Sequence, residues 1–143
     1  MTSPDATAPQ IPVSWGELID KITILEIKSE RLRAEGALAN VRYELALLRS
    51  LAAPVLETRP VVADTKTALR TVNERLWNVE DRLRELEAES DFGTEFIALA
   101  RSVYRNNDER AALKRNINDA VPCGIVEEKS YAGPASAETG WKP

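Results

Sequence analysis

Hydrophobic and polar positions alternate with the period of an α-helix along most of this chain. The clearest case is one mostly apolar row separated by steps of three or four residues: Val62, Thr65, Leu69, Val72, Leu76, Val79, Leu83 and Leu86. A mean spacing near 3.5 keeps such a row on one side of a long helix, which then needs a partner helix to cover it. The pattern predicts an amphipathic helix from about Val62 to Glu89, roughly 40 Å long at 1.5 Å per residue.

An earlier helix is predicted to begin at Ser14. Ser14 and Glu17 form an S-x-x-E capping box, in which the two side chains satisfy otherwise unpaired backbone donors. Ile24 and Ile27 project to the side opposite the main apolar row, so this helix is expected to lie between two layers. The main row consists of Leu18, Ile22, Leu25, Ser29 and Leu32.

The next helix is predicted from about Ala37 to Ala53. Gly36 alone separates it from the first helix, and the junction is either a tight turn or a kink. We favour the turn, because glycine suits the left-handed residue that ends many helices. Pro54 to Pro60 is predicted to be a break, bracketed by two residues that cannot continue a helix.

Beyond the long helix, Asp91-Phe92-Gly93 is expected to act as a stop. Two shorter helices follow in this interpretation, from Thr94 to about Arg105 and then to Ala120, with Asn106 and Asn107 as a cap between them. The segment from Ile125 to Tyr131 is expected to be short and extended, although the sequence leaves its state open.

These elements predict an all-α fold, an antiparallel bundle of about five helices with coiled-coil-like packing. The helical domain is expected to span residues 14–131, between disordered tails at 1–13 and 132–143 that are rich in proline, glycine and small residues. A homodimer is expected, because a compact monomer of this size would leave much of the long helix's apolar row bare.

Composition excludes several classes of function. The net charge of −4 argues against a general nucleic-acid binder, and no apolar run is long enough to span a membrane. The absence of histidine excludes His-dependent catalytic triads and zinc sites. A single cysteine and an N-terminus without signal-peptide features favour a cytoplasmic protein.

Four stretches together resemble a bacterial family of small helical proteins of unknown function. They are SWGELIDKITILEIKSERL (14–32), VNERLWNVEDRLR (72–84), LARSVYRNNDERAALKRNIN (99–118) and VEEKSY (126–131). The resemblance implies one self-contained domain and assigns no reaction. Members of that family occur alone or beside helical repeats and sugar-transfer machinery.

The first candidate site is a polar and aromatic row beside the apolar row of the long helix. Asn73, Trp77, Glu80 and Arg84 follow one another at i, i+4, i+7 and i+11. A tryptophan flanked by amide, carboxylate and guanidinium groups can hold a planar or sugar ligand. In the alternative interpretation, Trp77 covers the edge of the core and Glu80 pairs with Arg84.

Two further groups are candidates for ligand binding. In the first helix, Lys21 and Glu26 either face a ligand or select the neighbouring helix. In the predicted last helix, Asn107 would expose helix-start amides, and Arg110 and Lys114 project from nearly one side, as an anion site requires. The alternative is that these cations pair with carboxylates such as Glu80 or Glu127.

A magnesium site is the third possibility, by analogy with the all-α nucleoside triphosphate pyrophosphohydrolases. Glu17, Asp20, Glu80 and Asp81 would be its ligands, but the doubled-glutamate motif of those enzymes is missing. Cys123 has no histidine to activate it.

The favoured interpretation is a non-catalytic helical interaction or accessory module with a protein partner. No catalytic residue, metal ligand or cofactor is assigned. The alternatives are a binder of an anionic small molecule, such as a nucleotide, nucleotide sugar or phosphorylated metabolite, and the magnesium-dependent hydrolase.

Overall fold

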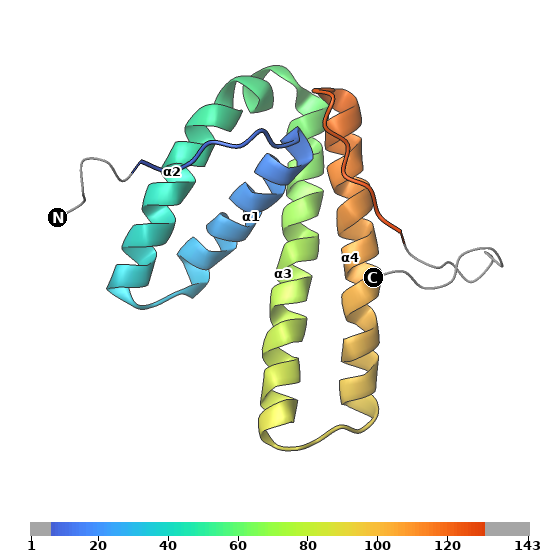
Figure 1. The fold of residues 1–143 in the computed structure, drawn as a ribbon. Coiled ribbons are helices and arrows are strands. Elements are labelled where there is room, and N and C mark those ends of the chain that lie inside the picture. Colours follow the sequence, from blue (N-terminus) through green and yellow to red (C-terminus); the bar gives the residue numbers. More distant parts are fainter. Residues whose placement is uncertain (1–6, 131–143) are drawn as a thin grey trace.

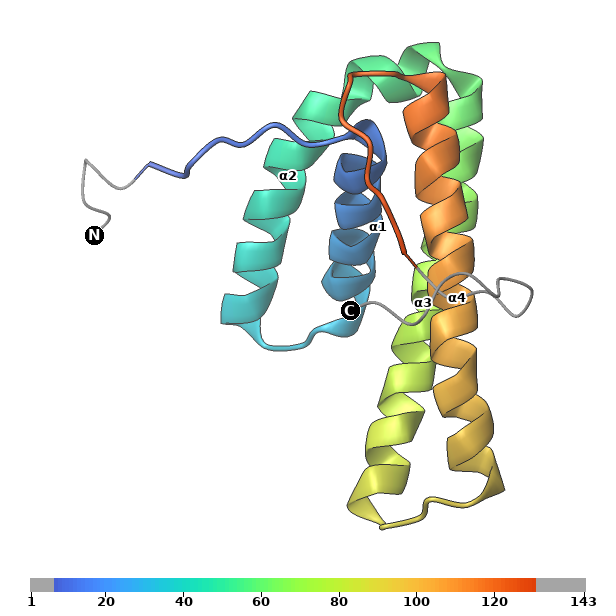
Figure 2. The same ribbon diagram turned by 45° about the vertical axis from the view of Figure 1, so that its right-hand side comes forward.

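The computed structural model describes residues 7–130, which form two helical hairpins (Figure 1). The first consists of α1 (Trp15–Arg31) and α2 (Glu35–Thr58), and the second of α3 (Pro60–Ala88) and α4 (Thr94–Ala120). The second hairpin is the longer and projects well past the loop that joins α1 to α2 (Figures 1 and 2). The predicted all-α fold is confirmed, since residues 7–130 contain no strand.

Helix α1 is the centre of the molecule. It packs against α2 on one side and against α3 and α4 on the other, which confirms that it lies between two layers. Its isoleucines at positions 19, 22 and 27 are at most 1% exposed. The helix starts as predicted, because the Ser14 hydroxyl accepts a hydrogen bond of 3.2 Å from the backbone N–H of Glu17. The other half of the predicted capping box is replaced, since the Glu17 carboxylate accepts a hydrogen bond from Lys114 of α4 at 2.8 Å.

The apolar row of α3 is largely covered within the chain. Leu69, Val72 and Leu86 are buried, and Leu76 is half-buried. The covering surfaces come from α4, which runs antiparallel beside α3, and from α1 (Figure 1). The expectation of a homodimer was based on an exposed apolar row in the long helix. In the single chain, most of that row is already covered.

The described part of the chain has four helices, so the expectation of about five is wrong. Residues 94–120 form one helix, and Asn106 and Asn107 lie in its interior. The Asn106 side chain donates a hydrogen bond of 2.9 Å to the Ser102 carbonyl one turn earlier instead of capping a new helix. The predicted anion site at a helix start near Asn107 is consequently wrong, because the amides there bond within α4.

The turn between α1 and α2 is confirmed, but Gly36 does not make it. Residues 32–34 form the connection, and Gly36 lies in the first turn of α2. The predicted break from Pro54 to Pro60 is wrong, since α2 continues through Pro54 to Thr58. Pro54 is exposed, and only Arg59 separates α2 from α3.

The chain around the bundle is irregular at both ends. Residues 7–13 form no regular secondary structure, and neither do residues 125–130. The remaining parts of the predicted tails, residues 1–6 and 132–143, lie outside the described residues, as does Tyr131. No helix among residues 7–130 has the length and apolar character needed to cross a membrane.

Candidate functional site

The C-terminal half of α1 diverges from the second hairpin (Figure 1). A groove lies in this region, between α1, α3 and α4. We call it the α1–α3–α4 groove, because these three helices contribute its walls. Its volume of about 560 Å³ lies within the range of roughly 300–1,000 Å³ that is typical of ligand pockets. The lining residues are Ile24, Ile27, Asn73, Leu76, Trp77, Glu80, Asp81, Arg84, Asn107 and Arg110.

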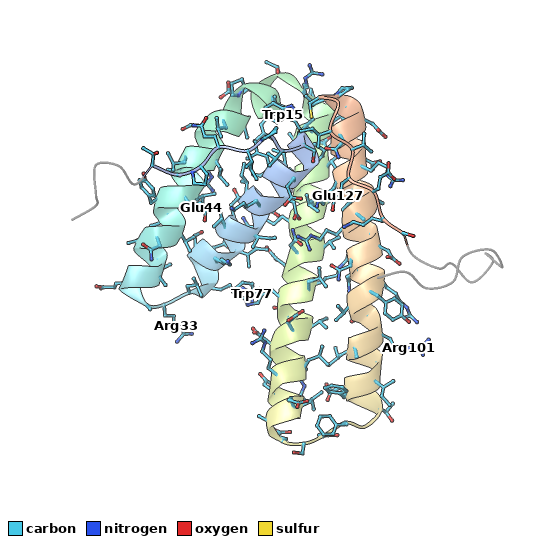
Figure 3. All side chains as sticks on the ribbon, in the orientation of Figure 1. Trp15, Arg33, Glu44, Trp77, Arg101 and Glu127 are labelled. Atoms are coloured by element: carbon cyan, nitrogen blue, oxygen red, sulfur yellow. The ribbon has the colours of Figure 1, made fainter. Side chains whose placement is uncertain are left out.

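Trp77 is the most prominent side chain of the groove. Its half-buried indole projects from α3 toward the end of α1 (Figure 3). Ile24 of α1 and Leu76 of α3 supply further apolar surface beside it, and the buried Ile27 lies behind them. A large aromatic surface that stays partly open to solvent can stack on a ligand or bury a partner's side chain.

A buried polar cluster forms one end of the groove. Asp20 is only 1% exposed, and Arg110 binds its carboxylate with Nε at 2.9 Å and Nη2 at 2.5 Å. Asn73 donates from Nδ2 to Asp20 Oδ1 at 2.9 Å and to the Thr23 hydroxyl at 2.8 Å. The hydrogen bonds to Asp20 raise the pKa of Arg110. The cluster therefore links α1, α3 and α4 through the Asp20–Arg110 ion pair and the hydrogen bonds of Asn73.

Lys114 makes a second charged link, one turn along α4 from Arg110. Its Nζ lies 2.8 Å from Glu17 of α1 and 2.8 Å from Glu127 beyond α4. Burial alone would lower the pKa of Lys114, but the hydrogen bonds to Glu127 and Glu17 outweigh burial and raise it. The hydrogen bond from Lys114, together with a smaller contribution from the hydrogen bond of Lys129, lowers the pKa of Glu127 to about 2.

The link to Glu127 fixes the segment after α4 against the bundle. This segment turns back from the end of α4 and runs beside that helix (Figures 1 and 3). It borders a cavity of about 280 Å³, whose lining shares Asn107 and Arg110 with the α1–α3–α4 groove. The two hollows therefore adjoin one another.

The structure brings five of the eight sequence-predicted site residues into one groove. Asn73, Trp77, Glu80, Asn107 and Arg110 all line it. The antiparallel packing of α3 and α4 makes these positions adjacent, although they come from distant parts of the chain. Lys114 lines the neighbouring cavity instead.

Lys21 and Glu26 lie away from the groove, where they link α1 to other helices. Lys21 pairs with Glu44 of α2 at 2.9 Å. Glu26 Oε2 accepts hydrogen bonds from Arg49 of α2 at 2.8 Å and from Lys66 of α3 at 3.2 Å. These contacts match the alternative interpretation, in which the charges of the first helix select its neighbours.

Glu26 is nevertheless an unusual group. Burial raises its pKa, but the hydrogen bond from Arg49 and the charge of Lys66 outweigh that effect and hold the pKa below 4.5. Its other oxygen, Oε1, is buried without a hydrogen-bond partner among the described residues. The cation of Arg70 lies 3.9 Å from Oε1, measured to Nη1, which is beyond hydrogen-bond range.

Sequence reasoning missed the structural role of Asp20, which it considered only as a metal ligand. A signal was present, because Asp20 and Thr23 share the helix side of Ile24 and Ile27. A carboxylate on a buried strip must find a cation. The sequence did not show that Arg110, 90 positions later, would supply it.

Three of the four proposed magnesium ligands face cations of the chain, and the fourth, Asp81, is exposed. Asp20 binds Arg110, Glu17 binds Lys114, and Glu80 lies 3.7 Å from Arg84. Within residues 7–130, no three carboxylate or thiol side chains are grouped so that they can share a metal ion.

Comparison with known proteins gives one result. No curated protein and no solved structure matches the chain significantly. The model of a family of unknown function, DUF6165, matches residues 10–141 and so spans both helical hairpins and the segment after α4. The chain belongs to this family of unknown function, DUF6165.

Proposed function

We propose that this chain is a non-catalytic helical interaction module that binds a partner protein in the α1–α3–α4 groove. The observation that carries the proposal is Trp77, a half-buried indole in a groove of about 560 Å³ beside Ile24, Ile27 and Leu76. A groove of this kind accepts one or two apolar side chains of a peptide segment.

The charges of the groove favour a basic segment. Its two arginines already face carboxylates, since Arg110 binds Asp20 and Arg84 lies 3.7 Å from Glu80. Asp81 also lines the groove and is exposed, so one negative charge remains in excess. A lysine or arginine next to an apolar anchor would complement Asp81 and the face of Trp77.

The same pairing counts against an anionic small molecule. Such a ligand would have to displace Asp20 from Arg110, or Glu17 and Glu127 from Lys114. Each displaced carboxylate would lose charge-assisted hydrogen bonds, which are the stronger kind.

A peptide library displayed on phage and selected against the full chain tests the proposal. We expect enriched peptides to carry a basic residue within a few positions of an aromatic or aliphatic one. Trp77→Ala and Asp81→Lys should each weaken binding of a synthesised peptide at least about tenfold, a change of about 1.4 kcal/mol.

Two matched variants outside the groove serve as controls. Tyr104→Ala removes a 53% exposed aromatic residue from α4, and Glu87→Lys reverses an exposed charge on α3. Both should bind the peptide as the unmodified chain does. Failure to enrich any peptide, or equal binding by Trp77→Ala, would contradict the proposal. Thermal stabilisation of the unmodified chain by nucleotides or nucleotide sugars would favour the anionic ligand instead.

A further inference from the structure

The α1–α3–α4 groove adjoins the segment that follows α4. Glu127 of this segment pairs with Lys114, and their charged atoms are 2.8 Å apart. Two residues later, Lys129 lines the cavity of about 280 Å³ together with Asn107 and Arg110. Both of these α4 residues also line the groove. The chain therefore comes to the edge of the groove just before the described residues end at position 130.

The direction of this segment leads toward the groove. It runs opposite to α4 and passes between α1 and α4 (Figure 2). Arg110 and Asn107 lie four and seven positions before Lys114 in α4, so they are one and two helical turns further along this path. The ion pair between Glu127 and Lys114 holds the segment on this course.

The next part of the sequence contains the kind of side chains that the groove is expected to bind. Trp141 and Lys142 place a large aromatic residue directly before a cation. Trp77 and the exposed Asp81 favour this combination of an apolar anchor and a neighbouring basic residue. The family match extends to residue 141. The matched region therefore includes Trp141 as well as the helices that form the groove.

The chain between Lys129 and Trp141 is long enough to connect the two places. Trp141 lies 12 positions after Lys129, a length that spans at most about 40 Å when fully extended. Seven of the eleven residues between them are glycine, alanine or serine, a composition typical of flexible linkers. A short tether gives the attached group an effective concentration on the order of millimolar. A modest affinity of the tail for the groove is therefore sufficient.

We propose that Trp141 and Lys142 occupy the α1–α3–α4 groove of their own chain, with the indole against Trp77 and the ammonium group beside Asp81. This inference rests on the proposed function, because the tail and a partner peptide then compete for one surface. Only the molecules with a free groove bind the partner, so the tail lowers the apparent affinity in proportion to its occupancy. The partner must displace the tail in order to bind.

A carbodiimide reaction on the full chain tests this placement without any partner. The reagent joins a lysine amine to a carboxylate in direct contact, with loss of water. We expect an amide bond between Lys142 and Asp81 in the product that has the mass of one chain, identified by peptide mass spectrometry. Trp141→Ala should reduce the yield several-fold, because the anchor is lost. Lys142 should not be joined to Glu87, an exposed carboxylate six positions beyond Asp81 in α3.

Peptide affinity tests the competition. Trp141→Ala should bind a selected peptide about tenfold more tightly than the native chain, the change expected when the tail fills the groove in about nine of ten molecules. Thr139→Ala is the matched control, because it changes the tail without removing the anchor or its charge. It should bind the peptide as the native chain does.

Three results would overturn the inference. They are equal reaction of Lys142 with Glu87 and Asp81, a Lys142–Asp81 product that has the mass of two chains, and binding of a selected peptide by Trp141→Ala no more tightly than by the native chain. The proposed function fails separately. If the Lys142–Asp81 product depends on Trp141 but neither chain binds any selected peptide, the groove serves the tail and no partner.

Discussion

The backbone N–H of Gly16 donates a hydrogen bond of 2.7 Å to the side-chain Oδ1 of Asn118, 102 positions later in the chain. The contact holds the start of α1 against the last turn of α4. A Cβ atom at Gly16 would lie 2.5 Å from the Lys114 carbonyl oxygen and 2.8 Å from Asn118 Oδ1. The position therefore requires glycine for a close approach between two helices rather than for a turn.

Gly16→Ala should lower the free energy of unfolding by about 1–3 kcal/mol, the range for overpacking a close-packed site. Urea denaturation monitored by circular dichroism measures the change. Gly36→Ala is the control, because a Cβ there meets nothing within 4 Å and the residue lies in α2. It should be neutral or stabilise the chain by up to about 1 kcal/mol. Equal effects of the two substitutions would contradict the close approach.

Removing one partner of the Asp20–Arg110 pair should destabilise the fold strongly. Asp20 is 1% exposed, so Arg110→Ala leaves a buried carboxylate with only Asn73 as its side-chain donor. We expect a loss of about 3–5 kcal/mol for either single alanine variant. The double variant should lose clearly less than the sum of the two, as measured by chemical denaturation. Strict additivity would show that the pair is not coupled.

Glu26→Gln should also destabilise the chain, by about 2 kcal/mol, since the neutral amide weakens two charge-assisted hydrogen bonds. Arg49 and Lys66 would lose their shared carboxylate. Glu57→Gln, an exposed position on α2, is the control and should leave the denaturation midpoint unchanged. A neutral effect of Glu26→Gln would mean that the buried carboxylate contributes no net stability.

The contact between Glu127 and Lys114 should depend on pH. The pKa of Glu127 falls from its ordinary 4.5 to about 2, so the contact stabilises the fold above pH 4.5. That contribution is lost as the pH falls from 4.5 toward 2. The raised pKa of Lys114 means that the contribution is fully present below its ordinary value of 10.5 and is lost only at higher pH.

NMR titration of the Glu127 side-chain carboxyl carbon measures this pKa directly. In Lys114→Met the value should return toward 4.5, whereas Lys129→Met should give a smaller rise, because Lys114 is the stronger contributor. A value near 4.5 in the native chain would show that the segment after α4 is not held in this way.

Helical periodicity predicted most of the fold, because burial of an apolar row leaves a regular trace in the sequence. It failed where local signals and packing disagree. Asn106 and Asn107 look like a cap, yet residues 94–120 pack along one hairpin and the helix stays continuous. Pro54 looks like a break, but its exposed position in α2 allows one missing hydrogen bond.

The groove was predictable only in part. Asn73, Trp77 and Glu80 are neighbours on one helix, so their spacing alone placed them together. The spacing of residues within one helix does not indicate which other helix packs against it. The helices that face these three residues could therefore not be predicted. Ile27 is buried as expected, but nothing in the spacing indicated that Ile24 and Ile27 would also border a groove.

The central position of α1 has a consequence for how this chain acquires its structure. Because α1 packs against α3 and α4 as well as against α2, cutting the chain at Arg59 should yield two fragments that each lack part of their core. The start of α1 can make its hydrogen bond to Asn118 only after α4 has packed against it. The core around α1 is therefore completed by residues about 100 positions later in the chain. Such dependence on distant segments slows folding and makes it strongly cooperative.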